Sequence, residues 1–144
     1  VLAAAGLKRL GLAARIRCVF ESGEMLPCAG QGALGIEVRS DNAALLQQLG
    51  TLTHEPTWLA VQAERAVSRA MGGSCSMPLA VHAQWRGDTL WLRAALGHPA
   101  RPLATLLRAE VEAAVVDDAQ ARALGERAAQ ALRSQGSAAY LADA

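Results

Sequence analysis

Cys75 is the residue of this chain whose type and setting best suit covalent chemistry. It lies in the run Gly72-Gly73-Ser74-Cys75-Ser76-Met77-Pro78, between a predicted amphipathic helix and a predicted strand. The glycines allow a tight turn of the backbone and leave room for a bulky group. A thiol on such a loop is accessible, so it can serve as a nucleophile or as a covalent tether. The alternative for a single cysteine is a half-buried, inert side chain.

The run Gly30-Gln31-Gly32 precedes a predicted strand and is a second candidate for binding. Paired glycines let a ligand or another backbone segment come close, and the amide of Gln31 can both donate and accept a hydrogen bond. The run lacks the Lys-Ser/Thr of a P-loop and the third glycine of a dinucleotide-binding motif. It is therefore a loop with binding capacity and not a phosphate-binding fingerprint.

Four basic residues gather near the start of the chain, namely Lys8, Arg9, Arg15 and Arg17. A guanidinium presents a planar fork that matches a carboxylate. The cluster therefore suits a ligand with several negative charges. The alternative is a solvated basic surface.

Two other motifs have simpler explanations. Arg86-Gly87-Asp88 separates two strand patterns, so it indicates a hairpin turn and not a cell-adhesion motif. Glu64 and Arg65 lie in the middle of a predicted helix, and we expect them on its exposed face or at a contact between domains.

The composition describes a globular protein. Of 144 residues, 52% are hydrophobic and 19% are charged, which argues against disorder. This length suffices for one ordinary domain or for a small domain with pieces of others. The formal net charge of +1 gives no electrostatic case for nucleic acid or a membrane surface. No apolar run approaches the roughly 20 residues of a membrane-spanning helix.

The cysteines and histidines point away from disulfides and metals. Cys18, Cys28 and Cys75 are odd in number and form no CxxC pair, which is typical of a reducing compartment such as the cytosol. The three histidines are scattered, and none stands at zinc-ligand spacing from a cysteine.

The first residues lead us to expect a piece of a longer protein. The run from Val1 to Gly6 has the pattern of the tail of a buried strand entering a turn. Lys8 and Arg9 follow this apolar run, whereas the charge of a signal peptide precedes it. We therefore expect that Val1 is not a natural start and that the chain is a C-terminal portion.

Residues 52–144 have the pattern of a self-contained α+β domain. Thr53 is the expected cap of a helix with Glu55 and Pro56 in its first turn, and Gly72 and Gly73 end that helix. Its predicted buried face consists of Leu59, Ala63, Ala66, Val67, Ala70 and Met71. Strands are predicted at Leu79–Trp85, Thr89–Leu96 and Leu103–Val111. Asp117 or Asp118 caps a last helix with Ala121, Leu124, Ala128, Ala131 and Leu132 on one face. This order predicts helices on one side of an antiparallel sheet.

Residues 1–50 look unable to fold alone. Gly6–Arg17 is short, basic and interrupted by glycine, which predicts a helical turn and a loop. Leu34, Ile36 and Val38 alternate with smaller or polar residues, which is the period of a strand. Asp41 is the expected cap of a short helix that Gly50 ends.

Four of these motifs together resemble a known family. They are Ala5-Gly6-Leu7-Lys8-Arg9-Leu10-Gly11-Leu12, then Leu26-Pro27 with Gly30-Gln31-Gly32-Ala33, then Ala63-Glu64-Arg65-Ala66, then the Cys75 loop ending at Pro78. In this order and spacing they resemble the C-terminal half of porphobilinogen deaminase, also called hydroxymethylbilane synthase. The resemblance covers nearly the whole chain and is strongest over 5–39 and 54–80.

The resemblance implies a transferase of haem and tetrapyrrole synthesis in the cytoplasm. Such an enzyme joins four porphobilinogen units head to tail with loss of ammonia, and water then frees the linear tetrapyrrole hydroxymethylbilane. A dipyrromethane cofactor is held by a thioether to a loop cysteine, and the matching position here is Cys75. By the same resemblance Arg9 contacts carboxylates of the pyrrole chain, and Gln31 lies near the active cleft. The partners implied are porphobilinogen, the growing polypyrrole chain and the N-terminal half of the same protein. The full-length protein would be a monomer that binds neither nucleic acid nor a membrane.

The resemblance also implies what this chain lacks. The family's catalytic aspartate and most carboxylate-binding residues belong to the N-terminal half, so we expect the chain alone to be inactive. Residues 1–25 would be the tail of domain 2, 26–51 a return segment completing domain 1, and 52–144 the third domain. Domains 1 and 2 would be α/β layers like those of periplasmic binding proteins. The alternative function is a non-catalytic small-ligand or interaction module of the same fold.

Overall fold

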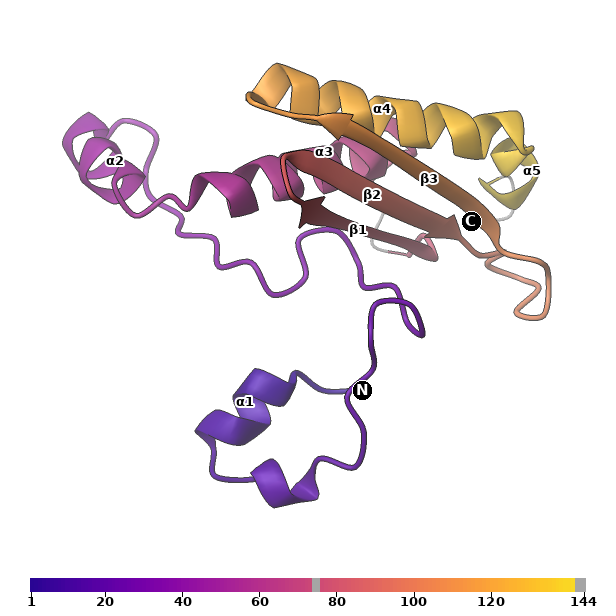
Figure 1. Ribbon diagram of the computed structural model, residues 1–144, viewed down its shortest axis with the longest axis horizontal. Helices are drawn as coiled ribbons and strands as arrows, with labels where there is room; N and C mark the ends of the chain where they lie inside the picture. Colours follow the sequence, from indigo (N-terminus) through magenta and orange to yellow (C-terminus); the bar gives the residue numbers. More distant parts are fainter. Residues whose placement is uncertain (74–75, 142–144) are drawn as a thin grey trace.

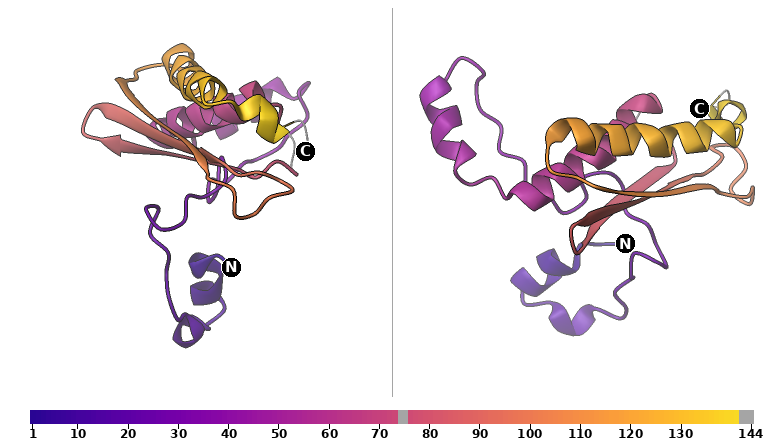
Figure 2. Two further views of the ribbon diagram at one scale, coloured as in Figure 1. Left: turned by 90° about the vertical axis from the view of Figure 1, so that its right-hand side faces the viewer. Right: turned by 45° about the horizontal axis from the view of Figure 1, so that its top comes forward.

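The computed structural model describes residues 1–73 and 76–141, and its C-terminal part is an α+β unit. The unit consists of α3 (Glu55–Ala70), β1 (Leu79–Arg86), β2 (Thr89–Leu96), β3 (Leu107–Ala114), α4 (Asp118–Ser134) and α5 (Ser137–Leu141). The three strands form an antiparallel sheet in the order β1-β2-β3. Helices α3 and α4 lie side by side across one face of this sheet (Figures 1 and 2). The α+β prediction is therefore confirmed.

The first hairpin confirms that Arg86-Gly87-Asp88 is a turn. Arg86 pairs with Thr89 at the end of the β1–β2 ladder, which leaves two residues in the connection. Gly87 has a φ of 60°, a left-handed conformation that glycine adopts without a steric penalty.

The core lies between the sheet and the two long helices. Alternate residues of β2 point into it, namely Leu90, Leu92, Ala94 and Leu96, and all four are buried. The predicted faces of α3 and α4 meet them, with Ala63, Val67, Leu124 and Leu132 fully enclosed. The apolar face of the strand, with a period of two residues, thus packs against the apolar faces of the helices, with a period of 3.6 residues.

Two of the predicted helix caps are wrong, and one is confirmed. Asp117 caps α4, because its side chain accepts a hydrogen bond from the Gln120 N–H at 2.8 Å. Thr53 does not cap α3, whose N-cap position is His54. Helix α2 (Ala43–Gly50) is capped by Asn42, which accepts from the Leu45 N–H at 3.1 Å.

Asp41, the predicted cap of α2, binds Arg39 instead. The Arg39 guanidinium lies 2.6 Å from the Asp41 carboxylate, and both side chains are exposed. This contact lowers the pKa of the Asp41 carboxyl below its ordinary value. A side-chain partner two residues away thus replaces the helix N-terminus as the partner of this carboxylate.

Two predicted strands in the N-terminal part are wrong. The first residues enter helix α1 (Ala4–Arg9), which is followed by the 3-10 turn η1 (Ala13–Arg15). The run from Leu34 to Val38 joins no sheet, and Leu34 is 98% exposed. A strand needs a neighbouring strand for its backbone groups, and the described part of the chain offers none there. The helical turn predicted over 6–17 is confirmed.

The third strand begins later than predicted. It starts at Leu107, whereas Leu103 is fully exposed in the connection from β2. A turn closes there, with the Ala104 N–H donating to the Arg101 carbonyl at 2.9 Å. The five-residue helix α5 was not predicted, and its Tyr140 hydroxyl donates to the Thr105 carbonyl of this connection at 2.6 Å. No described helix combines the length and the apolar character needed to cross a membrane.

Candidate functional site

Helix α3 ends in the glycine turn that leads to the predicted cofactor cysteine. The Gly73 N–H donates to the Ser68 carbonyl at 2.8 Å, and Gly72 and Gly73 both have positive φ. This confirms that the two glycines end the helix. Cys75 itself lies outside the described residues. The described chain resumes at Ser76, directly before Met77 and the start of β1 at Leu79.

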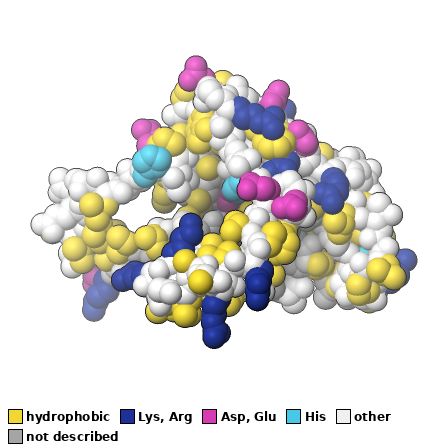
Figure 3. All heavy atoms as spheres, turned by 60° about the horizontal axis from the view of Figure 1, so that its bottom comes forward, with side chains coloured by type: hydrophobic (Ala, Val, Ile, Leu, Met, Phe, Trp, Pro, Cys, Tyr) yellow, Lys and Arg dark blue, Asp and Glu magenta, His cyan; other side chains and the backbone are white. Residues whose placement is uncertain are grey.

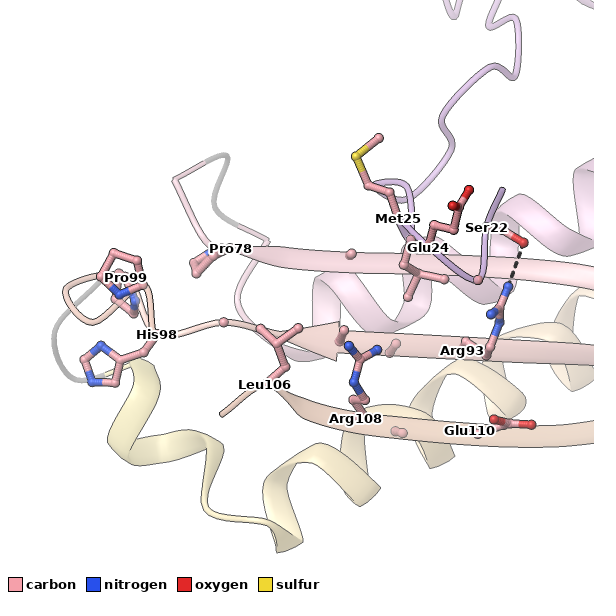
Figure 4. Close-up of a pocket in the computed structure, with 18 of the residues that line it drawn as sticks. Ser22, Glu24, Met25, Pro78, Arg93, His98, Pro99, Leu106, Arg108 and Glu110 are labelled. Carbon is pink, nitrogen blue, oxygen red and sulfur yellow. Dashed lines mark hydrogen bonds between the residues drawn. The ribbon is translucent and has the colours of Figure 1, made fainter. Parts of the chain in front are cut away.

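A cavity of about 690 Å³ lies beside the resumed chain. It is bordered by Ser76 and Pro78, by the segment 22–26, by the 97–106 connection, and by the sheet face opposite the helices. Figure 4 shows Arg93 and Arg108 rising from β2 and β3 toward this space. Part of the sheet's helix-free face therefore forms one wall of a hollow next to the Cys75 loop.

Arg93 is the best-placed cation of this cavity. Its Nη2 donates to the Ser22 hydroxyl at 2.8 Å, and its guanidinium carbon lies 4.2 Å from the centre of the Trp91 ring. Its Nε is buried and has no hydrogen-bond partner among the described residues. The side chain is thus oriented by two neighbours, and its Nε–H is left without an acceptor among the described residues.

The charges around the cavity are mixed. Among the described residues, two arginines and two glutamates line it, namely Arg93, Arg108, Glu24 and Glu110. Trp91 donates from Nε1 to the Glu110 carboxylate at 2.6 Å, so that carboxylate already has a partner. No cluster of metal-ligating side chains occurs within residues 1–73 and 76–141.

Gln31 lies in a short loop attached to the sheet edge. The Gln31 side chain is exposed and accepts a hydrogen bond from the Cys28 thiol at 2.9 Å. The Gly30 N–H donates to Glu64 Oε2 at 2.6 Å, and the Val81 N–H of β1 donates to the Pro27 carbonyl at 2.8 Å. Glu64 is therefore not on an exposed helix face, but joins the 27–31 segment to the C-terminal unit.

Arg9 is far from this arrangement in space. It lies in the last turn of α1 and is exposed, and its side chain forms no hydrogen bond or ion pair with any described residue. Helix α1 lies apart from the sheet and its helices (Figure 1). On the face shown in Figure 3, Lys and Arg side chains are spread among hydrophobic ones and form no single patch. Neither Arg9 nor Gln31 is among the described residues that line the cavity.

Sequence reasoning did not identify Arg93 as a cavity residue and did not predict that the Glu64 carboxylate is buried. Arg93 stands between the buried Leu92 and Ala94, so its position on the opposite face of β2 could be inferred from strand alternation. Glu64 follows Ala63 within the apolar face of α3, and a carboxylate there signals a buried acceptor. In both cases one partner comes from residues 22–30, and no local pattern shows that this segment lies against the C-terminal unit.

Two family models match the chain. The description "porphobilinogen deaminase, C-terminal domain" covers residues 58–134, which is more than half of the 144 residues. The chain belongs to the porphobilinogen deaminase family. The description "porphobilinogen deaminase, dipyromethane cofactor binding domain" covers residues 1–47. The resemblance recognised in the four sequence motifs is thereby confirmed.

Curated porphobilinogen deaminases from several bacteria are similar to the chain. The protein of Albidiferax ferrireducens is 60% identical over 134 residues, which are 93% of this chain and 42% of that protein. The protein of Paraburkholderia phytofirmans is 50% identical over 136 residues, 94% of this chain and 39% of that protein. The protein of Burkholderia mallei is 50% identical over 141 residues, with 98% and 42% covered. The chain thus spans about two fifths of the length of these porphobilinogen deaminases.

Proposed function

We propose that this chain is the C-terminal part of a porphobilinogen deaminase. The complete enzyme joins four porphobilinogen units with loss of ammonia, and water releases the linear tetrapyrrole hydroxymethylbilane. The observation that carries this proposal is the 60% identity to a porphobilinogen deaminase over 93% of the chain. The N-terminal half of the same protein is the partner that supplies the catalytic aspartate and most carboxylate-binding side chains.

In this proposal Cys75 is a tether. Its sulfur forms a thioether to a dipyrromethane cofactor, and the bond persists through every turnover. The glycine turn before it supports this role, because an accessible sulfur on an open loop can carry a chain that lengthens within a fixed site. When bound, the cofactor supplies the pyrrole carbon to which the first porphobilinogen unit is added.

The chemistry of the donors near the Cys75 loop fits a polycarboxylate cofactor. Each pyrrole ring carries an acetate and a propionate, and a guanidinium binds such groups through a bidentate fork. Arg93 has a buried Nε–H without an acceptor among the described residues, on the cavity that Ser76 borders. The roles of this chain are then to hold the tether at Cys75 and to pair carboxylates with Arg9 and Arg93. Gln31 and its two flanking glycines lie near the active cleft of the complete enzyme.

The remaining parts of the proposal concern the whole protein. It is a monomer of three domains in the cytoplasm, with this chain contributing residues 1–25 to domain 2, 26–51 to domain 1 and 52–144 to domain 3. The free thiols of Cys18 and Cys28 agree with a reducing compartment.

The mass of the peptide that carries Cys75 tests the tether. Protein expressed from the whole reading frame should carry an addition of two porphobilinogen-derived rings on this peptide. The Cys75→Ser variant should lose both the addition and the turnover of porphobilinogen. Cys18→Ser is the matched control, because it removes an exposed thiol elsewhere and should keep the addition.

The opposite result selects the alternative function. An unmodified Cys75 thiol in well-folded protein would exclude the enzyme and leave a non-catalytic ligand or interaction module of the same fold. The isolated 144-residue chain should show no turnover, since the acid–base aspartate is absent. Turnover by that chain alone would contradict the division of roles between the two halves.

A further inference from the structure

Glu64 is a buried carboxylate that joins three separate parts of the chain. It lies in the middle of α3 with 5% of its surface exposed. Its Oε2 accepts from the Gly30 N–H at 2.6 Å, and its Oε1 accepts from the Ala83 N–H of β1 at 2.8 Å. His82 Nδ1 lies 3.4 Å from Oε1. Both oxygens thus accept a hydrogen bond from a backbone N–H group of another segment.

Glu64 and the neighbouring segment satisfy two backbone donors on the free edge of the sheet. Strand β1 pairs with β2 on one side only. On its other side the Val81 N–H reaches the Pro27 carbonyl at 2.8 Å, and two residues on the Ala83 N–H reaches Glu64. The Pro27 carbonyl therefore takes one donor of this edge, and the Glu64 carboxylate takes the next donor where the 27–30 segment turns away.

The same bonds determine where Gln31 stands. The Gln31 N–H donates to the Cys28 carbonyl and the Ala33 N–H to the Gly30 carbonyl, both at 3.1 Å. Gly30 and Gly32 have φ of 74° and 84°, so two consecutive turns surround Gln31. The Gly30 N–H is the point at which these turns are attached to helix α3, whose last turn leads into the Cys75 loop.

We propose that Glu64 is a positioning residue that orients the Gln31 loop relative to the domain that carries Cys75. We call the Glu64 carboxylate with the Gly30 and Ala83 N–H groups the Glu64 anchor. Because the same helix holds the anchor and ends directly before Gly72 and Gly73, the anchor fixes the Gln31 loop relative to the end of α3. The consequence for catalysis rests on the function proposed above, whereas the anchor itself does not.

The anchor requires a carboxylate and not an amide. Two N–H donors need two acceptor oxygens, and a glutamine offers only one beside an NH₂ group. In Glu64→Gln that NH₂ group would face a backbone donor, so one of the two bonds would be lost at nearly constant volume. The buried group left without a partner then favours local opening.

Amide hydrogen exchange on protein from the whole reading frame tests the anchor. In Glu64→Gln we expect the Gly30 and Ala83 amides to exchange about ten-fold faster, with the Leu92 amide of β2 unchanged. The ratio kcat/KM for porphobilinogen should fall by a similar factor, while the Cys75 addition remains. Glu126→Gln makes the same change on an exposed face of α4 and should alter none of these quantities.

Each other outcome has a distinct meaning. Unchanged exchange at Gly30, or faster exchange throughout β2, would overturn the anchor. Faster exchange at Gly30 with unchanged kcat/KM would overturn the positioning role. Absence of turnover in the unsubstituted protein would reject the proposed function, yet exchange would still decide the anchor. If Glu64→Gln does not fold, amide exchange in the unsubstituted protein tests the anchor. The Gly30 amide should then exchange more slowly than the amide of the exposed Gly32, and equal rates would overturn the anchor.

Discussion

Gly125 is the residue that lets the two long helices touch. It lies in α4 and is buried against α3. A Cβ at this position would overlap the Ala63 carbonyl and stand 2.6 Å from the Ala66 Cβ. The glycine therefore permits a backbone approach that any side chain would block, and it has alanines as its neighbours on the partner helix.

Replacing Gly125 by alanine should push the helices apart. We expect Gly125→Ala to lower the free energy of unfolding by about 1–3 kcal/mol, the usual cost of overpacking a core. Denaturant unfolding measures this change. The matched control is Gly50→Ala, which adds the same methyl at the end of α2 where nothing lies within 4 Å. If both variants were equally stable, the close contact at Gly125 would not exist.

At the scale of elements, α4 is held at its start by a reciprocal pair of caps. Asp117 accepts from the Gln120 N–H at 2.8 Å, and the Gln120 side chain accepts from the Val116 N–H at 3.0 Å. The next residue, Asp118, accepts from Trp58 Nε1 at 2.6 Å and so ties α4 to α3. The start of α4 is thus fixed by side chains from within one turn and from the neighbouring helix.

The cap at Asp117 should contribute measurably to stability. We expect Asp117→Ala to lower the free energy of unfolding by about 1 kcal/mol, because one N–H of the first turn loses its acceptor. Asp117→Asn should stay close to the unsubstituted protein, since the asparagine oxygen caps equally well. Thermal or denaturant unfolding compares the three proteins. An equal loss in the asparagine and alanine variants would mean that charge, and not the hydrogen bond, stabilises this end.

At the scale of the whole molecule, the two parts of the chain differ in how much they bury. Most exposed large hydrophobic side chains lie in the first 52 residues, among them Leu2, Leu34 and Ile36. Within this N-terminal part, residues 22–30 are held more firmly, because they form hydrogen bonds with Arg93, Val81 and Glu64 of the C-terminal unit. Local opening is easiest where few apolar contacts are buried, so the N-terminal part should open first.

Limited digestion with trypsin should reveal this difference. In the isolated 144-residue chain we expect cleavage after Arg9, Arg17 and Arg39 before cleavage after Arg93 or Arg127. Mass spectrometry of the early fragments identifies the order. In protein from the whole reading frame the first three sites should be cut more slowly, because the rest of the protein would cover them. Equal rates at Arg39 and Arg93 in the isolated chain would contradict the difference in packing.

The sequence alone determined the C-terminal unit and the family. Apolar residues at helical and strand spacing decide which faces are buried from Leu59 to Leu132, because burial of those faces is the main driving force of folding. The turn at Gly87 depends on neighbours within three residues, so it could be predicted directly, and the cap of α4 could be narrowed to Asp117 or Asp118. The four ordered motifs identified the family for the same reason, since they are properties of the chain itself.

Only the tertiary structure decided what meets across long separations. Leu34 and Ile36 have the period of a strand, but a strand forms only where a partner satisfies its backbone groups. Glu64 has its partners 34 and 19 residues away, and Arg93 binds a serine 71 residues away. Periodicity states which face of an element a residue occupies, and not which distant segment will lie against that face. For this reason the anchor of the Gln31 loop emerged only from the folded chain.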